Sequence, residues 1–293
     1  MQTGVLAVLL AGVFGFFSVS LQGRLRSVLE RRPWLVWIAP LLLTGVFAGA
    51  SFLVAAFSPA LTLGVLAYST APVLCIYRAG AGAAKKPGLL DFGAILLLWM
   101  PIEVGLGASL VPRPAQGFLH SVIYGVAILL GLTLFLCFRS FPGMKCNLPR
   151  CRRDWWLPLA GFAALAPVLM VIGIPIGFLT LPHWPVRSAG AMAAGAGIIF
   201  SATAVPEEIL FRSLIQNLLM LRFGATGRTL ILASVIFGLA HIDNGPQAFP
   251  NWRYAILATV AGWAYGKVFQ KSSTVFSSAG LHAMVDWTKH FIF

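Results

Sequence analysis

Long apolar stretches separated by short polar segments run along most of the chain. Six of them are long enough to cross the ~30 Å hydrocarbon core of a bilayer, and they cover residues 4–21, 34–57, 61–77, 89–111, 118–138 and 155–181. The pattern continues with one longer stretch at 188–221 and three shorter ones at about 229–243, 254–270 and 275–291. We therefore predict an all-α fold, a polytopic membrane bundle of about ten transmembrane helices.

The composition agrees with a membrane protein. Hydrophobic residues account for 59% of the 293 residues and charged residues for only 10%, whereas about a quarter of a typical soluble domain is charged. The balance of 21 Lys and Arg against 8 Asp and Glu would suggest a nucleic-acid partner in a soluble protein. In a membrane protein the positions of the basic residues report topology first, so we expect a lipid bilayer as partner and no nucleic acid.

The basic residues favour one side of the predicted bundle. Sixteen Lys and Arg fall at the odd-numbered connections between spans and four at the even-numbered ones. The positive-inside rule then places the odd connections in the cytoplasm and both termini outside. The first 21 residues lack a basic n-region and a clear cleavage site, which indicates a retained span and not a signal peptide. The Ala, Gly and Arg richness suggests a prokaryotic cytoplasmic (inner) membrane.

The segment 188–221 is long for one crossing, and Pro206 interrupts its helical hydrogen bonding. It is either a kinked helix or two elements. Two full crossings would move Arg222 and Arg228 to the outer side and spoil the charge pattern. We therefore favour one crossing with an additional re-entrant or interfacial piece.

The stretch AVPEEILFR, residues 204–212, places three formal charges inside this apolar segment. Ionisable groups within a membrane are costly and usually belong to a site or to a structural pair. Glu208 and Arg212 are four positions apart and share a helix face, which predicts an ion pair between them. Glu207 is offset from Glu208 by about 100° around the helix, so it is free to face another partner.

Two later stretches supply candidate partners. His241 follows Phe237 by one turn in IFGLAHIDN, and SAGLHAMVDW places His282 and Asp286 on one helix face. At ~1.5 Å per residue from the predicted cytoplasmic ends, Glu207, His241 and His282 lie very roughly 15–22 Å deep. Side chains at similar depth on three spans can meet.

A glutamate, two histidines and an aspartate are groups that can activate water and stabilise an oxyanion. The alternative is a polar network that only joins helices. His120, His183 and His290 lack such partners in the pattern, and we interpret them as core residues. The four cysteines show no metal-ligand spacing and are interpreted as free thiols.

Three motifs, in this order on three of the last four predicted spans, resemble those of a known family. EEILFR matches E-E-x-x-x-R, FGLAH matches F-x-x-x-H, and HAMVD matches H-x-x-x-[ND]. Together they resemble the CAAX-protease and bacteriocin-processing family, intramembrane endopeptidases similar to the type II CAAX prenyl endopeptidase. The resemblance covers about residues 188–290. We accordingly divide the chain into an N-terminal transmembrane extension of unknown role, 1–187, and a protease-like core, 188–293.

The resemblance implies a glutamate-type intramembrane endopeptidase that needs no cofactor. Glu207 and His241 would activate the hydrolytic water. The supporting residues of the site would be Glu208, Arg212 and Phe237. A zinc site built from the acidic and histidine side chains is chemically conceivable, but we favour no metal.

His282 and Asp286 would bind the developing oxyanion. Asp286 stands where an asparagine is commoner in this family, and a carboxylate donates a hydrogen bond only when it is protonated. Asp286 is therefore either a protonated donor or an anion that orients His282. We favour the orienting role, because His282 lies one turn away on the same face.

Two functions of other classes stay open from the sequence. The chain could be a non-catalytic binding or immunity protein of the same family, or a proton-coupled transporter that uses the buried acids. An inverted repeat would favour the transporter, and the sequence shows none. An enzyme of this kind would act on a membrane-associated peptide or protein. Suitable substrates include a prenylated C-terminus, a bacteriocin leader and a membrane-anchored sorting signal. The sequence pattern does not indicate an oligomeric state.

Overall fold

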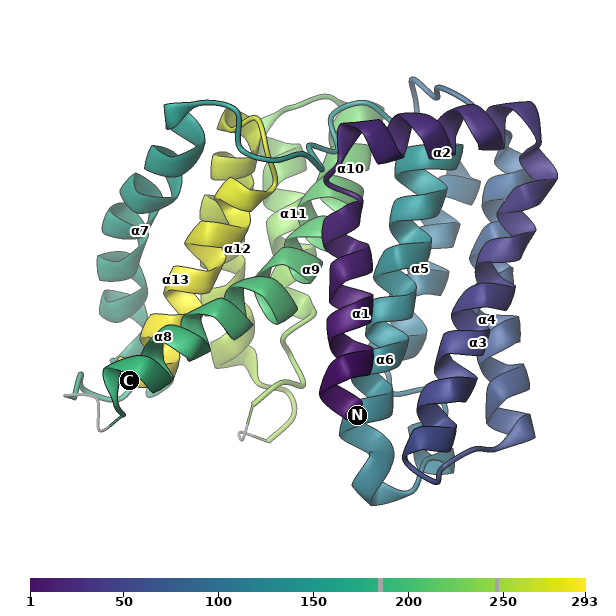
Figure 1. Cartoon of the computed structure of the whole chain (residues 1–293). Helices are drawn as coiled ribbons and strands as arrows, with labels where there is room; N and C mark the ends of the chain where they lie inside the picture. The colour runs from purple at the N-terminus through teal and green to yellow at the C-terminus, as the bar shows by residue number, and fades with distance from the viewer. Residues whose placement is uncertain (184–186, 246–247) are drawn as a thin grey trace. The chain divides into compact units, whose positions relative to one another are not determined.

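The computed structural model describes residues 1–183, 187–245 and 248–293, and all regular elements among them are helices (Figure 1). The chain forms two compact units, Met1–Gly143 and Met144–Phe293. Residues 144–183 thus belong to the same unit as the C-terminal helices, although they precede the region that resembles the protease family. The predicted division into an N-terminal extension, 1–187, and a protease-like core, 188–293, is a division by function and stays a prediction.

The N-terminal unit is a bundle of six α-helices. They are α1 (Gln2–Gly15), α2 (Val19–Arg31), α3 (Ile38–Leu53), α4 (Pro59–Ala79), α5 (Leu89–Glu103) and α6 (Arg113–Leu132). Helix α6 packs against α1, α3, α4 and α5. Its apolar face carries Leu119 and Val122, which are fully buried in one core cluster with Phe47 of α3. A short 3-10 helix, Pro33–Trp37, leads into α3, and a π-helical turn, Thr133–Phe138, extends α6.

The first predicted span, 4–21, is wrong as a single helix. Helix α1 ends at Gly15, and α2 begins at Val19 after a bend of 83°. The Ser18 side chain accepts a hydrogen bond from the Leu21 amide at 3.4 Å and so caps the new helix. Helix α2 is polar for most of its length, with Arg24 and Arg31 exposed, whereas α1 is apolar throughout.

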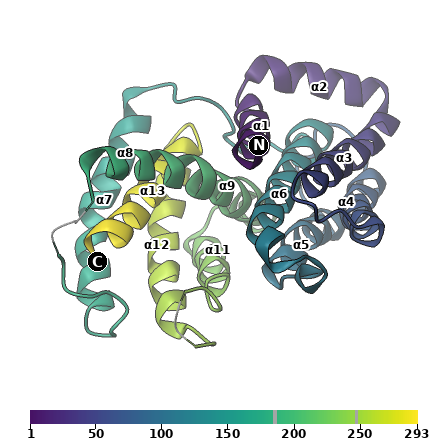
Figure 2. The same cartoon turned by 60° about the horizontal axis from the view of Figure 1, so that its bottom comes forward.

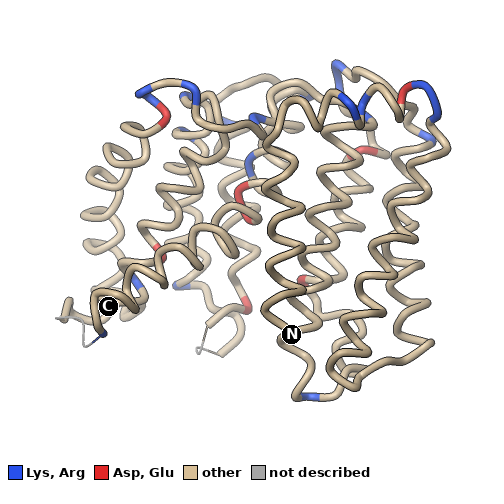
Figure 3. Tube along the Cα trace, in the orientation of Figure 1, with Lys and Arg blue, Asp and Glu red and all other residues tan. Residues whose placement is uncertain are grey.

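Basic residues in the N-terminal unit lie almost entirely at one end of its helices (Figure 3). The N-terminus lies at the opposite end of the same unit (Figure 1). This distribution is the one that the positive-inside rule requires of loops on a single side. The orientation of the termini across a membrane stays a prediction.

The C-terminal unit begins with α7 (Arg152–Gly173) and then a long helical run, 189–223. That run consists of α8 (Ala189–Ile198), a π-helical turn (Ile199–Ala204), α9 (Val205–Glu208), a second π-helical stretch (Ile209–Gln216) and α10 (Asn217–Phe223). It is continuous over 35 residues and forms one candidate span; the single crossing with a re-entrant or interfacial piece stays a prediction. The first wide turn ends just before Pro206, whose ring and missing N–H do not fit regular α-helical pairing.

Three further helices complete this unit: α11 (Gly227–Leu239), α12 (Trp252–Lys271) and α13 (Phe276–Ile292). Helix α13 lies against α7, α8, α9 and α12 (Figure 2). Helices α11 and α12 approach closely because both carry glycines at their contact. A Cβ added at Gly238 would lie 2.5 Å from the Ala255 carbonyl oxygen, so only glycine permits this spacing.

Five helical segments are long and apolar enough to cross a membrane, and the bent pair α1–α2 makes a sixth if it counts as one span. The five are Pro33–Leu53, Pro59–Ala79, Arg113–Phe138, Arg152–Gly173 and Ala189–Phe223. The predicted count of about ten is not confirmed. Helices α5, α11 and α13 occupy predicted spans but have only 15, 13 and 17 residues, and α12 is long enough but too polar.

Asp154 connects the start of α7 to the turn before α13. Its carboxylate accepts hydrogen bonds from the backbone amides of Arg150 at 2.8 Å and Ser273 at 2.8 Å, and from the Ser273 hydroxyl at 2.5 Å. Hydrogen bonds to a buried anion are stronger than neutral ones. Asp154 therefore holds α13, and the residues it carries, in register with α7.

We expect Asp154→Ala to lower the stability of the protein by roughly 3 kcal/mol or more, because charged hydrogen bonds contribute about 1.5–3 kcal/mol each. Thermal unfolding in detergent measures the change, with Asp243→Ala at an exposed position as control. Equal midpoints for the two variants would contradict this structural role.

Candidate active site

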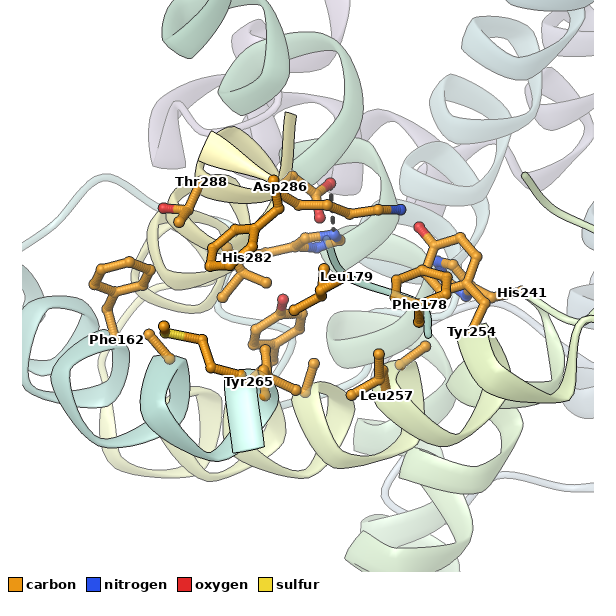
Figure 4. A pocket seen from close by; sticks show the side chains of 18 of the residues that line it. Phe162, Phe178, Leu179, His241, Tyr254, Leu257, Tyr265, His282, Asp286 and Thr288 are labelled. Atoms are coloured by element: carbon orange, nitrogen blue, oxygen red, sulfur yellow. Dashed lines mark ion pairs between the residues drawn. The ribbon is translucent and has the colours of Figure 1, made fainter. Parts of the chain in front are cut away.

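The charged residues singled out from the sequence come together in the C-terminal unit. Glu207 and Glu208 come from α9, and Arg212 from the π-helical stretch that follows. His241 lies just beyond the end of α11. Helix α13 contributes His282 and Asp286, two of the side chains drawn in Figure 4.

Glu208 is fully buried and binds two partners. One carboxylate oxygen accepts from Arg212 Nε at 3.1 Å, which confirms the ion pair predicted from the i, i+4 spacing. The other oxygen lies 3.1 Å from His282 Nδ1 on α13. A single carboxylate therefore joins its own helix to the helix that carries the second histidine.

Arg212 is also fully buried and continues the network along its own helix. Its Nη1 donates to the Gln216 side-chain oxygen at 3.2 Å, and Gln216 in turn donates to the Gly266 carbonyl of α12 at 3.1 Å. The guanidinium lies 4.9 Å from the ring centre of Phe237, a cation–π distance. Phe237 of α11 thus contacts this network, and its supporting role stays a prediction.

Glu207 faces away from this ion pair and toward both histidines. One of its carboxylate oxygens lies 3.8 Å from His282 Nε2 and 4.0 Å from His241 Nε2. The side chain is 23% exposed, in contrast to the fully buried Glu208. These distances are too long for direct hydrogen bonds to the two rings and match the separation that one bridging water spans.

The tautomer of His241 follows from its backbone partner. Its Nδ1 lies 2.8 Å from the Phe237 carbonyl oxygen. A carbonyl can only accept, so Nδ1 carries the proton and Nε2 of the neutral ring presents a lone pair toward Glu207. Tyr254 packs edge-on against this ring at a centroid distance of 4.8 Å and restricts its rotation.

His282 lies between carboxylates on both sides. Its Nδ1 is 3.1 Å from Glu208, and its Nε2 is 3.4 Å from Asp286 one turn further along α13. Because carboxylates accept hydrogen bonds, both ring nitrogens are placed to donate. Tyr265 stacks on the ring at 4.7 Å and an interplanar angle of 20°, so the imidazole is fixed in direction as well as in place.

A small cavity of about 80 Å³ opens beside this cluster. Figure 4 shows His241 and Tyr254 at one end of it, Phe162 at the other, and His282 with Asp286 along one wall. Aliphatic and aromatic side chains of α7, α12 and α13 make up most of the lining. The cavity therefore offers an apolar chamber with its polar groups gathered on one side.

The sequence reasoning missed several residues around this cluster. Tyr254, Tyr265 and Gln216 hold the catalytic candidates in place. Gln216 could have been found, since it extends the i, i+4 series of Glu208 and Arg212 by one more step. The tyrosines offered no such signal, because their partners lie on other helices.

The remaining histidines were assigned wrongly as core residues. His120, His183 and His290 are all exposed, and none contacts the acidic cluster in the described parts of the chain. The four cysteines are free, as predicted. Among the described residues, no group of three or more His, Cys, Asp or Glu side chains has the arrangement of a metal site.

We expect Glu208→Gln to destabilise the protein by roughly 3–5 kcal/mol, because it leaves Arg212 as a buried charge without its carboxylate. The measurement is thermal unfolding in detergent, together with the yield of folded protein. Glu207→Gln is the matched control, since the adjacent carboxylate is partly exposed and makes no ion pair with Arg212. A parent-like unfolding midpoint for Glu208→Gln would show that the buried pair is not structural.

Comparison with known proteins supports the family resemblance of this region. No curated protein and no solved structure matches the chain. Residues 188–288 match the family model described as type II CAAX prenyl endopeptidase Rce1-like, and this range contains all seven residues of the predicted site. About a third of the chain, residues 188–288, is therefore similar to the type II CAAX prenyl endopeptidase Rce1-like family, and the protein has several helices long and apolar enough to cross a membrane.

Proposed function

We propose that the protein is a glutamate-type intramembrane endopeptidase that cleaves a membrane-associated peptide or protein. The observation that carries the proposal is the placement of Glu207 within 4.0 Å of Nε2 of both His241 and His282. Both histidines line an apolar cavity. The match of residues 188–288 to a peptidase family supports the reaction class.

Glu207 and His241 are suited to activate one water molecule. Both present acceptors, and a water that donates to two acceptors holds them roughly 4 Å apart. A lone pair of the water oxygen is then directed away from Glu207 and His241 and toward the carbonyl carbon of a bound peptide. Glu207 takes the proton as the new C–O bond forms, and the same carboxylic acid returns it to the nitrogen as the peptide C–N bond breaks.

His282 is suited to stabilise the negative charge that develops on the carbonyl oxygen. The ring lines the cavity, its Nε2 is a donor near Glu207 and Asp286, and Glu208 at Nδ1 fixes the ring orientation. A donor held in place by the protein stabilises an oxyanion without reorganisation. Asp286, at 3.4 Å from Nε2, would orient the ring and balance its charge.

The apolar chamber supports a substrate that is itself lipophilic. Burial of apolar surface favours binding by about 25 cal/mol per Å², so a lipid-modified or membrane-spanning peptide would bind in such a lining better than a soluble one. We propose such a peptide as the substrate class. The Rce1-like family name is consistent with a prenylated end.

We expect Glu207→Gln to abolish cleavage and leave the fold intact, because an amide keeps the shape of the side chain but cannot accept a proton from water. The measurement compares peptide termini in the membrane fraction of cells that produce the parent or the variant at equal levels. Turnover within about tenfold of the parent would remove Glu207 from the role of base. Identical termini in cells with and without the parent protein would reject the hydrolase itself.

We expect Asp286→Asn to lower turnover at least tenfold, since loss of an orienting carboxylate is costly in comparable sites. A pH–rate profile beside the parent measures it. If Asp286 instead donates a hydrogen bond as a neutral acid, the amide would donate at every pH, and activity would equal or exceed that of the parent. That outcome would overturn the orienting role.

A further inference from the structure

A larger cavity lies between helices of the N-terminal unit. Its volume is about 680 Å³, within the range of ~300–1,000 Å³ typical of small-molecule sites, whereas the cavity beside the acidic cluster has about 80 Å³. Helix α4, the end of α5, helix α6 and the segment between α5 and α6 form its walls. Figure 1 shows that segment at the end of the unit where the N-terminus lies. The cavity is therefore built by the N-terminal unit alone.

The short length of α5 explains why this space exists. Helix α4 has 21 residues and α6 has 20, but α5 ends at Glu103 after 15. Residues 104–112 continue as a segment with one short 3-10 turn, Ala108–Leu110, in which Gly105 and Gly107 have positive φ angles of 62° and 81°. Glycine adopts such angles without steric cost. The segment therefore turns where α5 stops, and it lines the space that a longer helix would occupy.

The inner wall of the cavity is aliphatic. It is lined by four buried members of the unit's core cluster, Leu61, Val65, Val111 and Leu119. A water molecule in a cavity needs about two to four polar partners, and apolar cavities stay dry. An empty space in turn deprives the lining atoms of dispersion contacts. A hydrocarbon group is therefore the occupant that this wall favours.

The polar side chains that line the interior already have partners. The Tyr68 hydroxyl donates to the Leu98 carbonyl oxygen at 2.6 Å. The Gln116 side-chain amide donates to the carbonyl oxygens of Ala108 and Val111 at 3.1 and 3.0 Å. Gln116 thereby fixes the segment between α5 and α6 against α6, so the wall of the cavity is formed before a ligand binds.

The exposed part of the lining combines apolar and polar residues. Leu106 and Leu110 are 76% and 65% exposed, and the other polar side chains of the lining, Ser109 and His120, are also exposed. Helices α4 and α6 belong to segments that are long and apolar enough to cross a membrane, so lipid chains surround them. An amphiphile would place its chain in the cavity and its polar end at Ser109 and His120.

The depth of the cavity suits a chain from one leaflet of a bilayer. Its lining on α4 extends from Ala60 to Tyr68, which is roughly 12 Å along the helix axis at ~1.5 Å per residue. One leaflet of the hydrocarbon core is about 15 Å thick, half of ~30 Å. We propose that this cavity binds an acyl chain of a membrane phospholipid. The N-terminal unit is thus a lipid-binding unit, and this role does not depend on peptidase activity in the C-terminal unit.

Photo-crosslinking in a bilayer tests the proposal. The full-length protein is reconstituted in phosphatidylcholine vesicles with a trace of phosphatidylcholine that carries a diazirine on its palmitoyl chain. Peptide mass spectrometry measures the label on the cavity-lining residues of α4 and α6 relative to the label on the exposed residues of α3. We expect a several-fold excess on the cavity lining.

Gly64→Phe and Gly117→Phe should remove that excess, because each adds a ring at the cavity wall. Both glycines line the cavity, and a Cβ added at either meets no atom within 4 Å. We expect the label on the lining to fall roughly tenfold in whichever variant folds, as overpacking of a fitted apolar site predicts. Gly49→Phe on α3 is the matched control, since its surroundings are equally open but it does not line the cavity. Its labelling should equal that of the parent.

Equal labelling of the cavity lining and of α3 in the parent protein would overturn the proposal, because it would show ordinary contact with surrounding lipid only. An excess that persists in folded Gly64→Phe and Gly117→Phe would overturn it as well. A parallel probe, geranylgeraniol with the same diazirine, separates isoprenoid from acyl chains. Labelling of the lining by that probe and not by the phospholipid would reject the acyl chain as the ligand.

Discussion

The buried carboxylate of Glu208 is the interaction on which the arrangement of the C-terminal unit depends. A fully buried anion is tolerated only when its charge is balanced and its oxygens are hydrogen-bonded. Arg212 meets this requirement from the same helix and His282 from α13. The two helices must therefore lie at one mutual rotation, and that rotation carries Asp286 and Lys289 to the cavity.

Neighbouring glutamates have different surroundings because consecutive helical residues are offset by about 100°, and π-helical segments flank this pair on both sides. A wide turn precedes Pro206, and a second wide stretch begins directly after Glu208. Such turns shift the faces of a helix without ending it, and they occur frequently at functional sites. Glu208 turns inward to its ion pair, and Glu207 is left partly exposed beside two imidazoles. Separate environments for adjacent carboxylates allow one to be structural and the other chemical.

Aromatic rings give this polar cluster its rigidity. Phe237 contacts the guanidinium of Arg212, Tyr265 stacks on His282, and Tyr254 contacts both His241 and the ammonium of Lys289. Each ring excludes water and restricts a charged or polar side chain to one orientation. Catalysis by fixed dipoles needs side chains that are held in one orientation. Here the aromatic rings hold them beside an apolar cavity.

The sequence by itself determined what one helix can decide. The 3.6-residue period predicts that Glu208 and Arg212 pair, that Glu207 points elsewhere, and that His282 and Asp286 share a face. The length of the apolar stretches likewise predicted an all-α fold. The number of spans did not follow, because α5, α11 and α13 are shorter than their apolar stretches suggested, and α1 ends at a bend.

Only the tertiary structure decided the contacts between helices. The bond from Glu208 to His282, the proton position on His241 and the rings around Lys289 depend on helix rotation and spacing. Packing between helices sets this rotation and spacing, as at the close approach of α11 and α12 at Gly238. It leaves no periodic pattern in the sequence. Sequence spacing therefore identified the candidate site residues, and packing between helices assigned their partners.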